Sequence, residues 1–171
     1  LKSLLRSFFV LTLVLGFFIP LSSLHAKQKL QEEADPDAIT TLAKQALLID
    51  KATGAVLFEK NAKEKMPTSS MSKMVFAYAI FKALEAGKIK PNDIVIVSEK
   101  ARKMTGSRMF LEVNSRVTID ELVHGLIIQS GNDAAIALAE GIWGSEEAAV
   151  AAMNQVAIDL GLKDSHFTNV V

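Results

Sequence analysis

The sequence predicts an α/β protein of the α+β kind, in which helices pack against an antiparallel sheet. Short apolar strand patterns with turn signals dominate the first half of the chain, and long helical patterns dominate the second half. Half of the 171 residues are hydrophobic, cysteine is absent, and the formal net charge is zero. The chain therefore relies on an apolar core rather than on disulfides, and it has no basic field to hold nucleic acid.

The strand patterns begin with a predicted β-hairpin. Residues 46–50 and 55–59 are short apolar runs, and residues 51–54, Lys-Ala-Thr-Gly, are typical of the turn between them. Residues 87–93 form a second turn region, and residues 94–97, Ile-Val-Ile-Val, predict another short strand. Residues 98–107 are charged and are interpreted as a solvated loop.

Four segments predict helices. Residues 71–84 are apolar on nearly every side, so this helix is expected to be central, with Tyr78 in the core. Apolar residues recur along residues 117–129 at the spacing of an amphipathic helix, and Thr118 with Glu121 forms a capping-box pattern. The other two predicted helices cover residues 133–141 and the alanine-rich residues 145–160. Trp143 and the methionines are also expected in the core.

The N-terminus has the features of a secretory signal peptide. Lys2 and Arg6 precede an apolar run over residues 8–19, and Leu24-His25-Ala26 is a suitable cleavage site. We therefore expect a signal peptide over residues 1–26, and the alternative is an uncleaved anchor. Residues 27–45 form a polar leader, and the protein is expected to be exported, to the periplasm or the outer face of the cytoplasmic membrane.

Ser70 and Lys73 form the only Ser-x-x-Lys of the chain, at the start of the predicted apolar helix. Three residues apart on a helix places both side chains on one face, so Lys73 could accept the proton of the Ser70 hydroxyl. A buried lysine has a lowered pKa, which this role requires. The alternative is an ordinary helix N-terminus with capping serines and a solvated lysine.

Ser130-Gly131-Asn132 lies at a break between two predicted helices. One interpretation is structural, with Ser130 or Asn132 capping the following helix. The other is functional, with a hydroxyl and an amide directed into a cleft. The residues alone leave both interpretations open.

Taken together, these motifs resemble the serine-type D-alanyl-D-alanine carboxypeptidases, the low-molecular-weight penicillin-binding proteins. The resemblance covers residues from about Leu42 to Val171. It rests on Leu48-Ile49-Asp50 with Gly54, the 67–73 segment, Gly106-Ser107-Arg108-Met109, Thr118-Ile119-Asp120-Glu121-Leu122, Gln129-Ser130-Gly131-Asn132-Asp133-Ala134 and His166-Phe167-Thr168-Asn169. It implies a fold like that of β-lactamases and transpeptidases.

The resemblance also implies a function in cell-wall remodelling. The enzyme would remove the terminal D-alanine from peptidoglycan stem peptides, and β-lactams would inhibit it. Ser70 would be the acyl-ester nucleophile, Lys73 its proton acceptor and Ser130 the proton relay, while Asn132 would bind the substrate's amide. No metal or cofactor is implied.

One family motif, Lys-Thr-Gly, is absent from these 171 residues. The resemblance therefore implies that residues 46–171 are the N-terminal part of a transpeptidase-like catalytic domain. We assign the catalytic interpretation to the longer parent protein and do not expect activity from this fragment alone. Any membrane attachment would use a C-terminal segment beyond Val171.

Three alternatives remain. A class A β-lactamase usually has Ser-Asp-Asn and needs a deacylating glutamate, but no Glu-x-x-x-Asn follows Asn132. A Ser-His-Asp hydrolase would have a Gly-x-Ser-x-Gly motif, which this sequence lacks. His124 is expected on the surface, and His166 is expected to be structural. The third alternative is an inactive, truncated relative that binds peptidoglycan or penicillin without turning over substrate.

Overall fold

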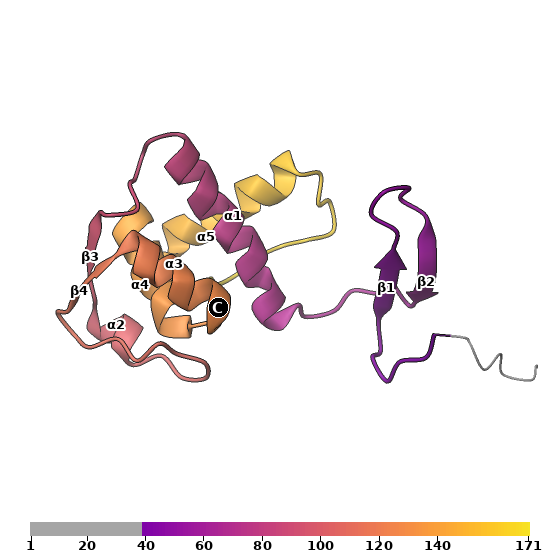
Figure 1. Cartoon of the computed structure of the whole chain (residues 1–171), viewed down its shortest axis with the longest axis horizontal. Helices are drawn as coiled ribbons and strands as arrows, with labels where there is room; N and C mark the ends of the chain where they lie inside the picture. Colours follow the sequence, from indigo (N-terminus) through magenta and orange to yellow (C-terminus); the bar gives the residue numbers. More distant parts are fainter. Residues whose placement is uncertain (1–38) are drawn as a thin grey trace, which may run out of the picture. The chain divides into compact units, whose positions relative to one another are not determined.

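The computed structural model describes residues 39–171, so the predicted signal peptide and most of the polar leader lie outside the described residues. Their boundaries therefore stay predictions. The chain divides into two compact units, one ending at Ala62 and the other running from Lys63 to Val171 (Figure 1).

The first unit contains the predicted β-hairpin. β1 (Ala46–Ile49) pairs antiparallel with β2 (Val56–Lys60), which confirms the hairpin. Asp50 closes the turn, because its carboxylate accepts hydrogen bonds from the Thr53 N–H at 2.7 Å and the Thr53 hydroxyl at 2.6 Å. Gly54 has a φ of +74°, a conformation that glycine adopts without steric cost.

The second unit is mainly helical, with one small sheet. The strands β3 (Ile94–Ile96) and β4 (Arg116–Thr118) pair antiparallel. The helical elements are η2 (Ser69–Met71), α1 (Ser72–Glu85), α2 (Glu99–Arg102), α3 (Ile119–Ile128), α4 (Asn132–Trp143) and α5 (Glu146–Asp159). The predicted α+β class is thus confirmed, with the described strands arranged as two separate pairs.

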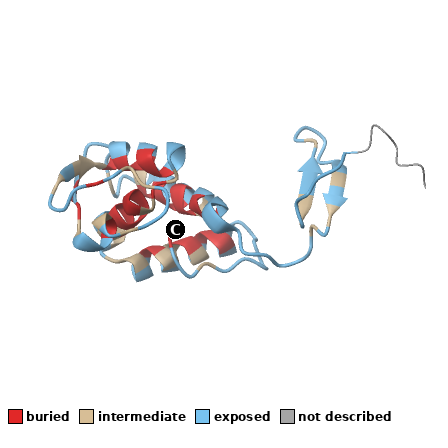
Figure 2. Ribbon diagram, turned by 90° about the horizontal axis from the view of Figure 1, so that it is seen from below, coloured by how far each residue is buried: buried red, intermediate tan, exposed pale blue. Residues whose placement is uncertain are grey.

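α4 is the central helix of this unit, and it contacts α2, α3 and α5. The buried residues of the unit gather on the helix faces that are turned towards one another (Figure 2). Residues 133–139 are all buried, and four of them are alanines that let neighbouring helices approach closely. Gly141 serves the same purpose towards the sheet, since a Cβ there would lie 2.5 Å from Val95 of β3. The helix that begins with Asn132 is therefore held on several sides.

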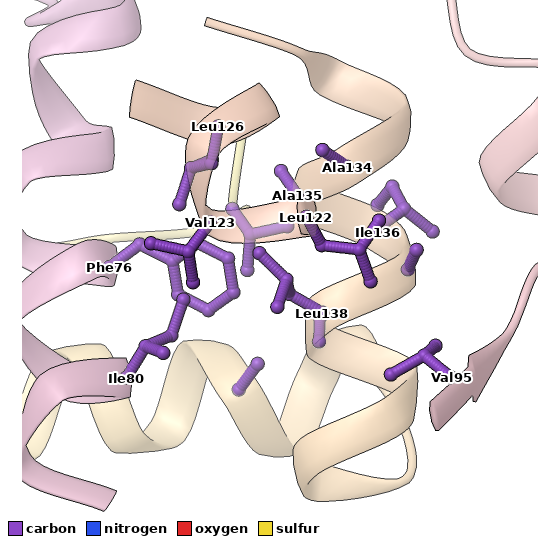
Figure 3. Close-up of a cluster of buried hydrophobic side chains, with 14 of the residues drawn as sticks. Phe76, Ile80, Val95, Leu122, Val123, Leu126, Ala134, Ala135, Ile136 and Leu138 are labelled. Atoms are coloured by element: carbon purple, nitrogen blue, oxygen red, sulfur yellow. The ribbon is translucent and has the colours of Figure 1, made fainter. Parts of the chain in front are cut away.

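The core lies between α1, α3, α4 and α5 (Figure 3). Phe76 and Ile80 extend from α1 towards Leu122 of α3, and all three are fully buried. Each such side chain contributes about 1.5–3 kcal/mol when it is buried. The Phe76 ring also packs against Trp143 at a centroid distance of 5.7 Å. This packing fixes α1, and with it Lys73, against the α3–α4 pair.

Some of the local predictions are wrong in detail. The helix predicted from Val117 begins at Ile119, because Thr118 is an N-cap with extended backbone and Val117 lies in β4. The predicted capping box is confirmed, with the Thr118 hydroxyl accepting from the Glu121 N–H and the Glu121 carboxylate accepting from the Thr118 N–H. The predicted loop over residues 98–107 contains the short helix α2, capped by Ser98.

The helix predicted over residues 71–84 was expected to be central, but α1 is buried on one face only. Met74, Tyr78 and Phe81 of α1 are 69%, 42% and 48% exposed, so Tyr78 is not in the core of the described unit. Met71 is half exposed as well, whereas Met153 is fully buried. Within residues 39–171, no helix has the length and apolar character needed to cross a membrane.

Candidate active site

The Ser70–Lys73 pair lies at the start of α1. Ser70 is exposed in the 3-10 turn η2, and Lys73 is one turn further along, with only 5% of its surface exposed. Lys73 Nζ is 3.4 Å from Ser70 Oγ, at the long end of hydrogen-bond distances. Ser69, just before the nucleophile candidate, has the uncommon φ of +47°. The lysine is therefore buried and adjacent to the serine, rather than solvated as the alternative interpretation required.

The α3–α4 junction supplies the other two candidate residues. Ser130 adopts a φ of +55°, which directs both its hydroxyl and its carbonyl towards Lys73, with distances to Nζ of 3.1 Å from Oγ and 2.8 Å from the carbonyl oxygen. Asn132 Oδ1 is 2.6 Å from the same Nζ. The structure thus brings together all four residues predicted for the site, from segments almost sixty residues apart in sequence.

The surroundings of Lys73 act on its proton in two directions. Burial lowers the pKa of Lys73, because the charged ammonium loses solvation. The Asn132 and Ser130 carbonyl oxygens can only accept hydrogen bonds, so they favour the protonated form. The amine therefore donates hydrogen bonds to these oxygens, while burial favours the neutral form that can accept a proton from a hydroxyl.

The side-chain amide of Asn132 is held at both ends. Its Nδ2 donates to the Thr105 carbonyl at 2.7 Å, which leaves Oδ1 to face Lys73. Its backbone N–H donates to the Ser107 carbonyl at 2.8 Å. Sequence patterns did not identify Thr105, because only its backbone contributes and no residue type signals that.

A largely apolar hollow of about 390 Å³ adjoins these polar groups. Met74, Tyr78 and Phe81 line it along α1, and Leu126 and Ile127 line it along α3; Ala77 and the site residues Ser70, Lys73 and Ser130 complete the lining. Tyr78 and Met74 are therefore not in the core, contrary to the prediction. Their exposure beside Ser70 follows from their spacing on α1, on the face opposite Phe76 and Ile80.

The two histidines within residues 39–171 do not join this group. His124 is exposed on α3, as expected, and its Nδ1 lies 2.8 Å from the Asp120 carbonyl. His166 is exposed and borders different hollows, beside residues 65–68 and beside Gly161 and Leu162. Among residues 39–171, no group of His, Asp or Glu side chains is arranged to hold a metal ion.

A serine beside a buried lysine, with a second hydroxyl and an amide around the amine, defines the class of proteins that transfer acyl groups through a serine. The model of the peptidase S11 family, D-alanyl-D-alanine carboxypeptidase, matches residues 29–171. The chain therefore belongs to this family.

Individual relatives agree with the family match. D-alanyl-D-alanine carboxypeptidase DacF of Bacillus subtilis is 47% identical over 127 residues, which are 74% of this chain and 33% of DacF. DacC of Escherichia coli is 40% identical over 144 residues, covering 81% of this chain and 36% of DacC. The chain thus spans about a third of the length of these relatives.

Solved structures share the fold. The crystal structure of the carboxypeptidase DacD from Francisella tularensis superposes with a TM-score of 0.73 at 34% identity, over 78% of this chain and 32% of that one. Penicillin binding protein 5 of Haemophilus influenzae gives a TM-score of 0.72 at 35% identity, over 78% of this chain and 40% of that one. The β-lactamase/transpeptidase-like fold predicted from the motifs is confirmed.

Proposed function

We propose that the protein carrying this chain is a serine-type D-alanyl-D-alanine carboxypeptidase, which removes the terminal D-alanine from peptidoglycan stem peptides. One observation carries the proposal: Lys73 Nζ is buried within 3.4 Å of Ser70 Oγ, 3.1 Å of Ser130 Oγ and 2.6 Å of Asn132 Oδ1. This arrangement brings together a nucleophile, a base, a second hydroxyl and an amide. The names of the relatives support the substrate class.

The acylation step follows from these positions. Neutral Lys73 accepts the proton of Ser70 as Ser70 Oγ attacks the carbonyl carbon of the penultimate D-alanine. The peptide C–N bond breaks, and the proton passes through the Ser130 hydroxyl to the nitrogen of the leaving D-alanine. The backbone N–H of Ser70, in the first turn of its helix, has no intrahelical partner and can donate to the oxyanion. Asn132 orients the substrate's amide.

Deacylation completes the cycle. A water molecule attacks the ester carbonyl, the bond to Ser70 Oγ breaks, and the serine recovers a proton. In a β-lactam the attacked amide is part of the ring, so the same attack opens the ring and leaves an acyl-enzyme. The proposal favours a carboxypeptidase over a class A β-lactamase, since the relatives carry the former name and the chain has no Glu-x-x-x-Asn after Asn132.

The same proposal includes export. The substrate is a component of the cell wall, and residues 1–26 have the sequence features of a signal peptide. The expected location is the periplasm or the outer face of the cytoplasmic membrane. Finding the complete protein in the cytoplasm with residues 1–26 retained would contradict this part of the proposal.

Labelling with a fluorescent penicillin tests the function. The complete protein is expected to gain one covalent penicillin, on the peptide that contains Ser70, and Ser70→Ala should abolish the label. The complete wild-type protein should also release D-alanine from a peptide ending in D-Ala-D-Ala. A label on Ser69, Ser72 or Ser130 would overturn the assignment of the nucleophile. A folded wild-type protein that takes no label would identify an inactive relative instead.

A further inference from the structure

Asp133 is a buried carboxylate next to the site that the proposed mechanism does not use. It follows Asn132 in the first turn of α4, and only 1% of its surface is exposed. A buried charge is costly unless hydrogen bonds satisfy it. Asp133 accepts three of them, all from backbone N–H groups: Oδ1 from Met109 at 3.0 Å and from Ala134 at 2.9 Å, and Oδ2 from Leu111 at 3.1 Å.

Two of these donors belong to the segment of residues 105–111, which has no regular secondary structure. The carboxylate thus ties this segment to the N-terminus of α4 across more than twenty residues of sequence. The carboxylate is also crowded on its own helix, since a Cβ on Gly131 would lie 3.0 Å from Asp133 Oδ1. Phe110, between the two donors, has a φ of +61°, so the segment is held in a conformation that few residues adopt freely.

The same segment holds Asn132. The Thr105 carbonyl accepts from Asn132 Nδ2, and the Ser107 carbonyl accepts from its backbone N–H. There is little free space, because a Cβ on Gly106 would lie 3.0 Å from Asn132 Nδ2. The position of Asn132 Oδ1 against Lys73 therefore depends on where this segment lies.

We propose that Asp133 is a positioning residue for acylation: by holding the 105–111 segment, it fixes the Asn132 amide in the orientation that faces Lys73 and the substrate. The inference rests on the proposed function, since it concerns the same site. It assigns the buried carboxylate a role through Asn132, and Asp133 itself touches neither the nucleophile nor the base in any hydrogen bond of the described residues.

Asp133→Asn in the complete protein is the main test. The carboxamide has nearly the same shape but only one oxygen, and its NH₂ group would face backbone N–H donors that it cannot satisfy. We expect penicillin acylation to slow by about 10–100-fold, the scale of a small misplacement of catalytic groups. Amide hydrogen exchange at Met109 and Leu111 should accelerate. The matched control is Asp159→Asn, an exposed carboxylate on α5, which should change neither readout.

A double-mutant cycle separates positioning from general structural damage. If Asp133 acts through Asn132, Asp133→Asn should slow acylation by less than about 3-fold when Asn132→Ala is already present, because the two effects are not additive. Equal slowing in both backgrounds would overturn the proposal, as would a wild-type rate in the single variant or unchanged protection of Met109 and Leu111.

Gly106→Ala decides the question if Asp133→Asn gives no cooperative melt. The substitution disturbs the segment and not the carboxylate, because φ at Gly106 is +79° and the added methyl would lie 3.0 Å from Asn132 Nδ2. A similar loss of acylation in a folded protein would support the proposal, and a wild-type rate would overturn it. Failure of the proposed function is distinguishable, because the wild-type protein would then take no penicillin and the inference would fall with it. If the wild-type protein is labelled and the Asp133→Asn variant is fully active, the inference about Asp133 is wrong and the proposed function stands.

Discussion

Two helix junctions in the second unit carry a serine and use it differently. At the α4–α5 junction, Ser145 has extended backbone, and its hydroxyl accepts a hydrogen bond from the Ala148 N–H at 3.1 Å, as an N-cap does. At the α3–α4 junction, the N-cap position is Gly131, and no side chain caps α4. Ser130 instead has a left-handed conformation, with its hydroxyl towards Lys73.

The difference bears on the two interpretations of the Ser130-Gly131-Asn132 triplet. A polar side chain at the start of a helix normally accepts a hydrogen bond from an unpaired backbone N–H, so a side chain that does not cap the helix is free to contact another group. At the α3–α4 junction, neither Ser130 nor Asn132 caps α4, and both contact the buried amine of Lys73. The predicted side-chain cap by Ser130 or Asn132 is therefore absent, which favours the functional interpretation of this triplet.

The largest expected effect comes from removing that shared amine. Lys73→Met keeps a chain of similar length in the same buried space but removes the base, so acylation by penicillin should slow by at least about 10²-fold. The fold should remain intact, as judged by a cooperative thermal melt. An acylation rate within a few-fold of wild type would mean that Lys73 is only a helix residue, and the two junctions would then differ in geometry alone.

The pH dependence of the wild-type rate sharpens this prediction. Burial lowers the pKa of Lys73, so the neutral form that can accept a proton persists to lower pH than for an exposed lysine. Acylation should therefore fall as the pH decreases through this lowered pKa, and the fall should be absent from the residual rate of Lys73→Met. A profile that is the same in both proteins would assign the titration to another group.

Local patterns predicted most of the helices and strands. The hairpin, the capping box at Thr118 and the amphipathic face of α3 each depend on residues within one or two turns, which is the range that such patterns cover. The start of α3 was placed two residues early, although an N-cap is itself non-helical and Thr118 therefore excluded Val117 from the helix. The β3–β4 pairing, which uses Val117, is non-local and left no signal in the helix pattern.

The site was predicted by residue type, whereas its supports were not. Ser70 and Lys73 are one turn apart, and Ser130 and Asn132 were recognised through the family resemblance. The carbonyl of Thr105 and the buried carboxylate of Asp133 act through backbone groups across more than twenty residues. No spacing rule reports such contacts, because they depend on how the 105–111 segment crosses the start of α4.

The next prediction replaces each of the two junction serines with alanine in a separate variant. Ser130→Ala removes the hydroxyl next to Lys73 and leaves the backbone carbonyl contact at 2.8 Å, so the lysine should stay in place while proton transfer to the leaving group is lost. We expect acylation to slow by about 10²-fold, near the low end for general acid–base groups. Ser145→Ala should acylate at the wild-type rate. Equal rates for the two variants would erase the functional distinction between the junctions.

The last prediction concerns stability, where the ranking of the two serines should reverse. Ser145→Ala leaves the Ala148 N–H without its acceptor, and loss of an N-cap costs about 0.5–2 kcal/mol. Ser130 caps nothing, and alanine keeps its backbone contact with Lys73, so Ser130→Ala should destabilise the protein less than Ser145→Ala does.

Thr118→Ala, which removes half of a capping box, is the positive control for the size of a cap effect. Urea unfolding of the complete protein, with slopes compared to verify that each variant unfolds in the same way, measures all three. If Ser130→Ala lost as much stability as Ser145→Ala, its hydroxyl would be a structural support of the α3–α4 junction, and the slowed acylation of that variant could no longer be assigned to proton transfer.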